Sequence, residues 1–169
     1  MAGRTFEKAV FLDRDGVINH DPGDYTTTLD DFEILPGTVE KLKIWWQSGW
    51  GLIVITNQGG IDKGMYSASE VRAMHQYLQG LCAAQGFAID AFYFCPHHPE
   101  YSGKCLCRKP GSLMIEKAMH HFQLKPANCV MLGDRERDMD SASGAGVRGV
   151  LLPINRGIAA LPDDPALLW

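Results

Sequence analysis

The sequence has no long run of apolar residues. No uncharged apolar stretch approaches the roughly 18 residues of a membrane-spanning helix, so we expect no association with a membrane. Residues 1–8 also lack the apolar segment of a secretion signal, and a cytoplasmic location is the expectation that follows. Neither an internal repeat nor a low-complexity stretch interrupts the chain, and its 169 residues are interpreted as one domain, 1–169.

An excess of positive charge is missing as well. The 16 lysines and arginines are outnumbered by 20 aspartates and glutamates, which gives a formal net charge of −4. This balance argues against a nucleic-acid-binding surface, because such surfaces need clustered basic residues. Hydrophobic residues make up 46% of the chain, which is enough to fill the core of one domain. We therefore expect a monomer whose partner is a small molecule.

What is present is a regular alternation of short apolar runs and helical segments. We expect strands at 9–12, 52–55, 91–94, 129–132 and 147–152, and helices at 38–47, 112–122, 138–145 and from a cap at Ser67 or Ser69 to about residue 85. The apolar strands are typical of strands covered on both faces. This pattern predicts an α/β fold, a Rossmann-like parallel sheet with helices on both faces. After Pro153 we expect a tail that wraps the surface loosely.

The first strand ends in the segment Asp13-Arg14-Asp15-Gly16. Carboxylates at the carboxyl end of a strand face the crevice where open α/β sheets bind ligands. They repel each other unless a cation lies between them, so the segment indicates a metal-assisted active site. Taken alone, the tetrapeptide is equally compatible with an Asp-Gly turn that holds two solvated acids, and the other strand ends decide between these interpretations.

Polar residues that follow the later strands suit phosphoryl transfer. Asp13 is the candidate nucleophile, which attacks phosphorus in line and forms an aspartyl-phosphate. Asp15 is the candidate acid–base group, which protonates the leaving alkoxide and then activates a water molecule. The candidate ligands of Mg²⁺, a hard cation that prefers carboxylates and phosphate oxygens, are Asp13, Asp15 and Asp134.

The substrate phosphate also needs donors and positive charge. The candidate residues for this role are Thr56, Asn57, Arg108 and Lys109. Asp138 either orients Lys109 or serves as an acidic residue in the first turn of a helix, where it favours the helix dipole. The sequence leaves both interpretations of Asp138 open.

A second constellation precedes Lys109. Cys95-Pro96-His97 and Cys105-Leu106-Cys107 are two pairs with one-residue gaps, bridged by seven residues. Three thiolates and one imidazole make a tetrahedral set for structural Zn²⁺ with no open position, so the metal would pin the loop and place Lys109. His98 is a rival of His97, and reduced cysteines without a metal are the alternative.

In order and spacing, four motifs resemble those of the haloacid dehalogenase superfamily of phosphatases. They are Asp13-Arg14-Asp15-Gly16, Thr56-Asn57, Lys109 and Gly133-Asp134-x-x-x-Asp138. The resemblance covers nearly the whole chain and implies a Rossmann-like sheet, Mg²⁺ and an aspartyl-phosphate intermediate. The motifs leave no room between them for the cap domain that members usually carry, so we expect no large cap and an open site.

The cysteine loop narrows this resemblance. Cys95-Pro96-His97-His98-Pro99 and Cys105-x-Cys107-Arg108-Lys109-Pro110 are similar to the loop of the D-glycero-D-manno-heptose-1,7-bisphosphate 7-phosphatase family, and histidinol-phosphate phosphatases have a related loop. Residues 56–64 also favour the heptose family, whereas residues 20–36 depart from both. The resemblance implies a small phosphorylated sugar as substrate.

Two alternatives stay open. The first is a phosphatase for histidinol phosphate or another small phosphomonoester, because the length of the cysteine loop does not separate the two families. The second is a zinc-stabilised binding domain without turnover. The complete set of catalytic residue types argues against the second alternative.

Overall fold

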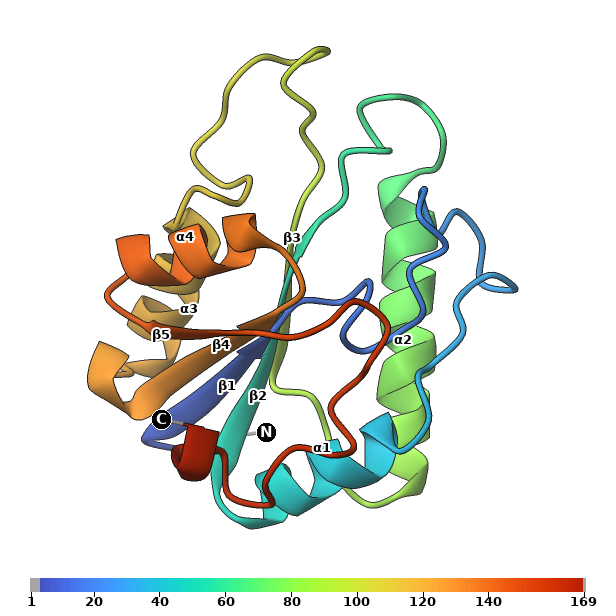
Figure 1. Cartoon of the computed structure of the whole chain (residues 1–169). Helices are drawn as coiled ribbons and strands as arrows, with labels where there is room; N and C mark the ends of the chain where they lie inside the picture. The colour runs from blue at the N-terminus through green and yellow to red at the C-terminus, as the bar shows by residue number, and fades with distance from the viewer. Residues whose placement is uncertain (1–3, 169) are drawn as a thin grey trace.

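The computed structural model describes residues 4–168 and confirms the α/β class. Five parallel strands form one sheet in the order β3-β2-β1-β4-β5 (Figure 1). The strands are β1 (Lys8–Leu12), β2 (Trp50–Asn57), β3 (Ala91–Cys95), β4 (Cys129–Gly133) and β5 (Arg148–Leu151). The helices are α1 (Thr38–Gln47), α2 (Ala68–Ala84), α3 (Leu113–Phe122) and α4 (Glu136–Gly144), with short 3₁₀ turns at Pro126–Asn128 and Pro165–Leu168.

Two helices cover each face of the sheet (Figure 1). On one face, Val10 and Leu12 of β1 join an apolar cluster with Leu42 of α1 and Met74 of α2. The residue between them, Phe11, points to the other face and packs in a second cluster with residues of α3 and α4. Successive side chains of a strand alternate between faces, so burial on both sides explains why the strands are apolar throughout.

The structure decides which of the two candidate serines caps α2. Ser67 caps α2, because its hydroxyl accepts a hydrogen bond from the Glu70 amide at 3.2 Å. The Glu70 carboxylate accepts one from the Ser67 amide at 2.6 Å, which completes a capping box. In α1, Trp45 is the inward tryptophan and is fully buried, whereas Trp46 is partly exposed at the edge of the core.

The expectation of a loose tail is wrong. The indole of Trp45 donates a hydrogen bond to the Pro162 carbonyl at 2.9 Å, and that of Trp50 donates one to Asp164 Oδ1 at 3.2 Å. Ile158 is fully buried in the apolar cluster that also contains Leu42 and Trp45 of α1. Buried indole N–H groups need acceptors, and the tail supplies them. The tail is therefore a packed part of the fold.

β1 and β4 lie side by side at the centre of the sheet, and the chain continues from them toward opposite edges. Ligands of open α/β sheets bind at such a switch point, outside the carboxyl ends of the strands. Asp13 follows β1 and Asp134 follows β4, and the Asp13 amide donates to the Leu132 carbonyl at 2.9 Å. The long loops after β2 and β3 rise above the same end of the sheet (Figure 1).

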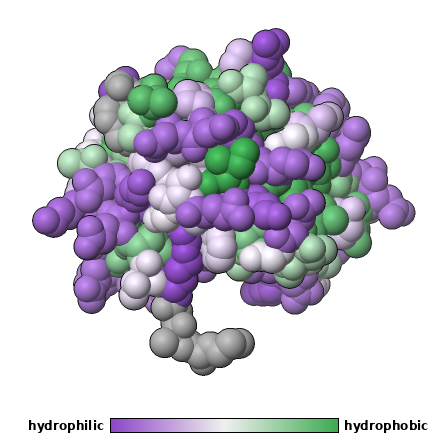
Figure 2. Space-filling view, turned by 90° about the horizontal axis from the view of Figure 1, so that it is seen from below, coloured by the Kyte–Doolittle hydropathy of each residue, from purple (hydrophilic) through white to green (hydrophobic). Residues whose placement is uncertain are grey.

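The amino-terminal end of the sheet lies on the opposite surface, which Figure 2 shows from below. Polar side chains cover much of this surface, and apolar side chains appear in separate patches between them. Within residues 4–168, no helix combines the length and the apolar character that crossing a membrane requires. The predicted catalytic residues all lie at the other end of the sheet.

Candidate active site

A buried lysine lies at the centre of the candidate site. Lys109 Nζ is 2.9 Å from Asp13 Oδ1 and 2.6 Å from Asp138 Oδ1, and it donates a hydrogen bond to the Ile55 carbonyl at 2.8 Å. Burial opposes the charge of Lys109, but the two carboxylates outweigh it and raise its pKa. The ammonium group therefore stays charged between Asp13, which follows β1, and Asp138, which lies in the first turn of α4.

Asp138 performs both of the roles that the sequence leaves open. Its Oδ1 contacts Lys109, while its Oδ2 accepts a hydrogen bond from the Arg135 amide at 3.0 Å at the start of α4. Gly133 allows this arrangement, because a Cβ there would lie 2.3 Å from the Asp138 Cβ. The same carboxylate thus caps the helix and holds the lysine.

Asn57 holds the backbone of Lys109. Its side-chain oxygen accepts a hydrogen bond from the Lys109 amide at 2.9 Å, and its amide donates to the Lys109 carbonyl at 3.0 Å. This pairing of side chain and backbone joins the end of β2 to the loop before α3. The role predicted for Asn57, donation of a hydrogen bond to a phosphate, stays a prediction. Only the second amide hydrogen of Asn57 is left for such a bond.

Three carboxylates form a group that suits a hard cation. Asp13, Asp134 and Asp138 each offer an oxygen, and these atoms lie within 4.8 Å of one another. Asp134 Oδ1 is buried and has no hydrogen-bond partner among the described residues. Burial raises the pKa of Asp134 and that of Asp13, the latter to about 7. A divalent cation would satisfy the unpaired oxygen and favour both ionised forms, so the donor set fits Mg²⁺.

Asp15 lies outside this group and is held by three neighbours. Arg14 Nη2 contacts both carboxylate oxygens at 2.9 and 3.0 Å, the Asn19 amide donates to Oδ1 at 2.9 Å, and the Gln58 amide donates to Oδ2 at 2.9 Å. Burial alone would raise the pKa of Asp15, but these partners hold it below its usual value. The assignment of the Asp15 side chain as a Mg²⁺ ligand stays a prediction.

Thr56 is buried at the end of β2, and among the described residues its hydroxyl has one hydrogen-bond partner, a neighbouring glutamine. Gln58 Nε2 donates to Thr56 Oγ1 at 2.9 Å, and Tyr66 donates to Gln58 Oε1 at 2.8 Å. Gln58 therefore connects Thr56 to Asp15. The structure brings together the predicted phosphate-binding and acid–base residues through a residue that the sequence analysis did not select.

Four residues of this network are not predicted from the sequence, namely Arg14, Asn19, Gln58 and Tyr66. Arg14 lies between the two motif aspartates, and Gln58 directly follows Thr56-Asn57, so adjacency to a motif was the available signal. Arg14 is fully buried, with its guanidinium 5.3 Å from the centre of the Phe32 ring. Asn19 and Tyr66 carry no local signal, because only the folded chain brings them to Asp15 and Gln58.

The predicted zinc ligands form a compact cluster. Cys107 Sγ lies 3.1 Å from Cys95 Sγ and 3.6 Å from Cys105 Sγ, and His97 Nδ1 is 3.4 Å from Cys107 Sγ. A tetrahedral site with Zn–S bonds of 2.3 Å has sulfur–sulfur edges of about 3.8 Å, so the cluster is slightly contracted but of the right shape. All five cysteines are free thiols. The rival His98 lies outside the cluster.

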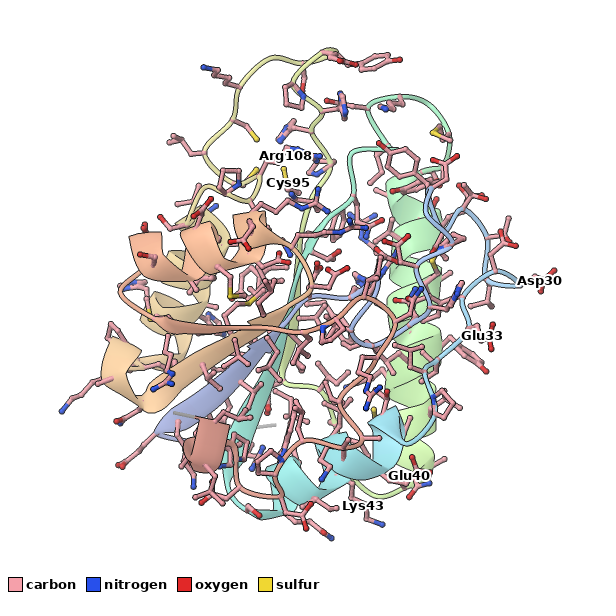
Figure 3. All side chains as sticks on the ribbon, viewed as in Figure 1. Asp30, Glu33, Glu40, Lys43, Cys95 and Arg108 are labelled. Carbon is pink, nitrogen blue, oxygen red and sulfur yellow. The ribbon has the colours of Figure 1, made fainter. Side chains whose placement is uncertain are left out.

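The cysteine loop carries Arg108 to the carboxyl end of the sheet. Arg108 Nη1 donates to the His97 carbonyl at 3.0 Å, and a Cβ at Gly59 would lie 2.8 Å from the same nitrogen. Asp62 ties the loop after β2 to this loop, because its carboxylate accepts from the His98 amide at 2.7 Å. Figure 3 shows Arg108 and Cys95 together above the strands, far from Glu40 and Lys43 on α1.

Comparisons with known proteins agree with this geometry. A HAD-hydrolase-like family model matches residues 106–159. D-glycero-beta-D-manno-heptose-1,7-bisphosphate 7-phosphatase of Haemophilus ducreyi is 38% identical over 166 residues, which cover 95% of this chain and 91% of the relative. The D-glycero-alpha-D-manno-heptose-1,7-bisphosphate 7-phosphatase of Burkholderia mallei is 40% identical over 154 residues, with coverages of 88% and 81%.

A solved structure extends the comparison to three dimensions. The D,D-heptose 1,7-bisphosphate phosphatase from B. bronchiseptica, crystallised with magnesium and phosphate, superposes with a TM-score of 0.80 at 31% identity. The match covers 85% of this chain and 79% of that chain. The chain thus shares both sequence and fold with phosphatases of one substrate class over most of its length.

Proposed function

The chain belongs to the family of D-glycero-D-manno-heptose-1,7-bisphosphate 7-phosphatases, and from this membership we propose that it removes the 7-phosphate of such a heptose bisphosphate. The observation that carries the proposal is the buried Asp13–Lys109–Asp138 cluster beside Asp134, at the switch point of the sheet. We further propose that the protein acts as a single-domain monomer in the cytoplasm.

In the proposed reaction Asp13 is the nucleophile. One of its oxygens attacks phosphorus, the bond from phosphorus to the sugar oxygen breaks, and an aspartyl-phosphate forms. Lys109 supplies a fixed positive charge 2.9 Å from the attacking carboxylate, where negative charge on the phosphoryl group must be stabilised. Mg²⁺ held by Asp13 and Asp134, with Asp15 as the third predicted ligand, would let an anionic nucleophile approach an anionic phosphate.

Asp15 moves the protons in this proposal. It gives a proton to the departing sugar alkoxide, then takes one from the water that cleaves the aspartyl-phosphate and releases inorganic phosphate. Its partners keep the pKa low in the free protein, which suits the second step. A bound phosphate dianion beside Asp15 opposes its negative charge and so favours the protonated form that the first step needs.

We assign Zn²⁺ to Cys95, His97, Cys105 and Cys107, and a positioning role to the metal. The support is the closeness of the four donor atoms and the direct continuation of the chain into Arg108. Hydrogen bonds from backbone amides and neighbouring thiols outweigh burial and lower the pKa of Cys105 to about 7, which favours the thiolate that a metal binds. Arg108 and Lys109 are then held by a closed metal site.

The charge of Arg108 should favour one of the two candidate substrates over the other. Its charge lies at the carboxyl end of the sheet beside Gly59, where a second phosphate would be attracted and the cationic amine of histidinol phosphate would be repelled. We expect a preference of at least about tenfold in kcat/KM for heptose 1,7-bisphosphate over histidinol phosphate. That ratio requires only about 1.4 kcal/mol, which one charge-assisted contact supplies.

The test is phosphate release from a panel of substrates: both anomers of heptose 1,7-bisphosphate, fructose bisphosphate, histidinol phosphate and a simple aryl phosphate. Arg108→Ala should lower the preference for the heptose bisphosphate and spare the aryl phosphate. Lys117→Ala, which removes an exposed charge on α3, is the control and should change neither. Equal or faster turnover of histidinol phosphate would replace the heptose assignment with the amino-alcohol alternative.

A further inference from the structure

Gln58 is a buried amide with four polar partners. It is 1% exposed. Its Nε2 lies 2.9 Å from both Asp15 Oδ2 and Thr56 Oγ1, and its Oε1 lies 2.8 Å from the Tyr66 hydroxyl and 3.3 Å from Arg14 Nη2. The side-chain amide therefore uses both N–H groups and both oxygen lone pairs. No other residue links Asp15 to Thr56 within residues 4–168.

The charged neighbours permit one orientation of this amide. A guanidinium only donates hydrogen bonds, so the atom of Gln58 that faces Arg14 must be the oxygen. An ionised carboxylate only accepts, so the atom that faces Asp15 must be the nitrogen. The opposite orientation would place donor against donor at Arg14 and acceptor against acceptor at Asp15. The direction of the whole network follows from these two contacts.

This orientation determines where the Thr56 hydroxyl proton points. Thr56 Oγ1 accepts from Gln58, and the structure gives it no other partner among the described residues. Its own O–H is therefore left to donate elsewhere. We propose, on the basis of the phosphatase function above, that Gln58 is a positioning residue that keeps the Thr56 hydroxyl as a donor toward the substrate phosphate while it holds Asp15 in place.

Tyr66 connects the hydrogen-bond network of Gln58 to the loop after β2. With the Gln58 oxygen facing it, the Tyr66 hydroxyl must donate. Its ring fills the space where a Cβ of Gly60 would lie, at 2.2 Å from Cε1, and its centroid is 6.0 Å from that of Tyr25. The loop that borders the site opening is thus anchored on the same amide that orients Thr56.

The experiment is a double-mutant cycle read by the affinity of the full-length protein for inorganic phosphate in the presence of Mg²⁺. Gln58→Glu keeps the shape but offers Thr56 an acceptor, which turns its proton away from the phosphate. We expect the dissociation constant of phosphate to rise about tenfold or more. In a Thr56→Val background the same substitution should change it less than about threefold, because no hydroxyl is left to turn.

Simple charge repulsion by the new carboxylate would raise the dissociation constant by the same factor in both backgrounds, and this result would overturn the proposal. If Gln58→Glu does not fold, Gln58→Met removes the donor without adding a charge. We then expect a rise of about threefold or more that is absent in the Thr56→Val background. An unchanged phosphate affinity in a folded Gln58→Met variant would also overturn it.

Gln79→Glu is the matched control. The Gln79 amide is held by the backbone of Ile89 at 3.0 and 3.1 Å, away from the site, so this change should lower the melting temperature without altering phosphate affinity. Binding of phosphate by calorimetry needs no turnover. If the heptose bisphosphate proves not to be a substrate, the function proposed above fails while the cycle still tests Gln58.

Discussion

Replacing Lys109 with methionine tests the buried ion cluster most directly. The substitution keeps the length of the side chain and removes the charge that lies 2.9 Å from Asp13 and 2.6 Å from Asp138. Both carboxylates then remain in a buried position without their cation. Removing one partner of a buried ion pair costs about 3 to 5 kcal/mol, mainly because the remaining charge is desolvated and unpaired.

These energies convert into measurable changes. For a chain of this size, 1 kcal/mol corresponds to about 2 to 4 °C in melting temperature, so Lys109→Met should melt about 6 to 20 °C below the wild type. Turnover should fall by about 10² to 10³, which is typical when a preorganised positive donor to a transition state is removed. Thermal melts by circular dichroism and phosphate release from an aryl phosphate measure the two effects.

A second variant separates stability from catalysis. Adding Asp138→Asn to Lys109→Met removes one of the two unpaired charges and should restore about 1 to 3 kcal/mol of stability but no activity. Lys41→Met is the control: its partner Asp163 is largely exposed, so the loss should be about 1 kcal/mol and turnover should not change. A Lys109→Met variant with wild-type melting temperature, or a double variant no more stable than the single one, would refute the reasoning.

The nucleophile, the zinc cluster and a buried histidine can each be tested separately. Asp13→Asn should lower turnover by about four orders of magnitude or more with an unchanged fold, since the amide cannot attack phosphorus; near-normal activity would reject the aspartyl-phosphate route. Purified protein should contain about one zinc per chain by elemental analysis, and Cys107→Ser should lose both the zinc and most of the activity; a zinc-free, active wild type would end that assignment. Burial, with Arg14 nearby, lowers the pKa of His75 to about 3. The unfolded chain alone takes up this proton below about pH 6.5, so between pH 7 and pH 5 the wild type should lose about 2 kcal/mol more stability than His75→Phe in urea titrations; equal losses would contradict the buried neutral histidine.

The elements, and the end of the sheet at which the candidate site residues gather, were predictable, because each depends on a local pattern. Apolar runs and helix caps predict the strands and helices, and a parallel sheet places Asp13 and Asp134 at the carboxyl ends of two strands. The hydrogen bonds that position these groups were not predictable. Asn57 forms hydrogen bonds with the backbone of Lys109, 52 positions away, and Tyr66 donates one to Gln58 across a turn. Neither contact leaves a periodic or compositional trace.

The tail shows the same limit at a larger scale. Its glycines, prolines and acids are typical of a solvated segment, but the indoles of Trp45 and Trp50 both donate hydrogen bonds to it. A buried N–H needs a partner, and the sequence does not say which of many distant carbonyls will provide it. The sequence shows that a buried indole N–H needs an acceptor, but only the tertiary fold determines which group provides it.

The strand order has a consequence for synthesis on the ribosome. β1 is made before both of its partners, because one of its edges pairs with β2 and the other with β4, where Ala9 faces Cys129. Until β4 has left the exit tunnel, the second edge of this apolar strand has no partner in the nascent chain, and an unpaired apolar edge invites aggregation. Asp134 follows β4 directly, so the carboxylates of the proposed Mg²⁺ site meet only at the step that closes this edge. A chain that stalls before that point would expose this edge of β1 and would also lack the assembled candidate active site.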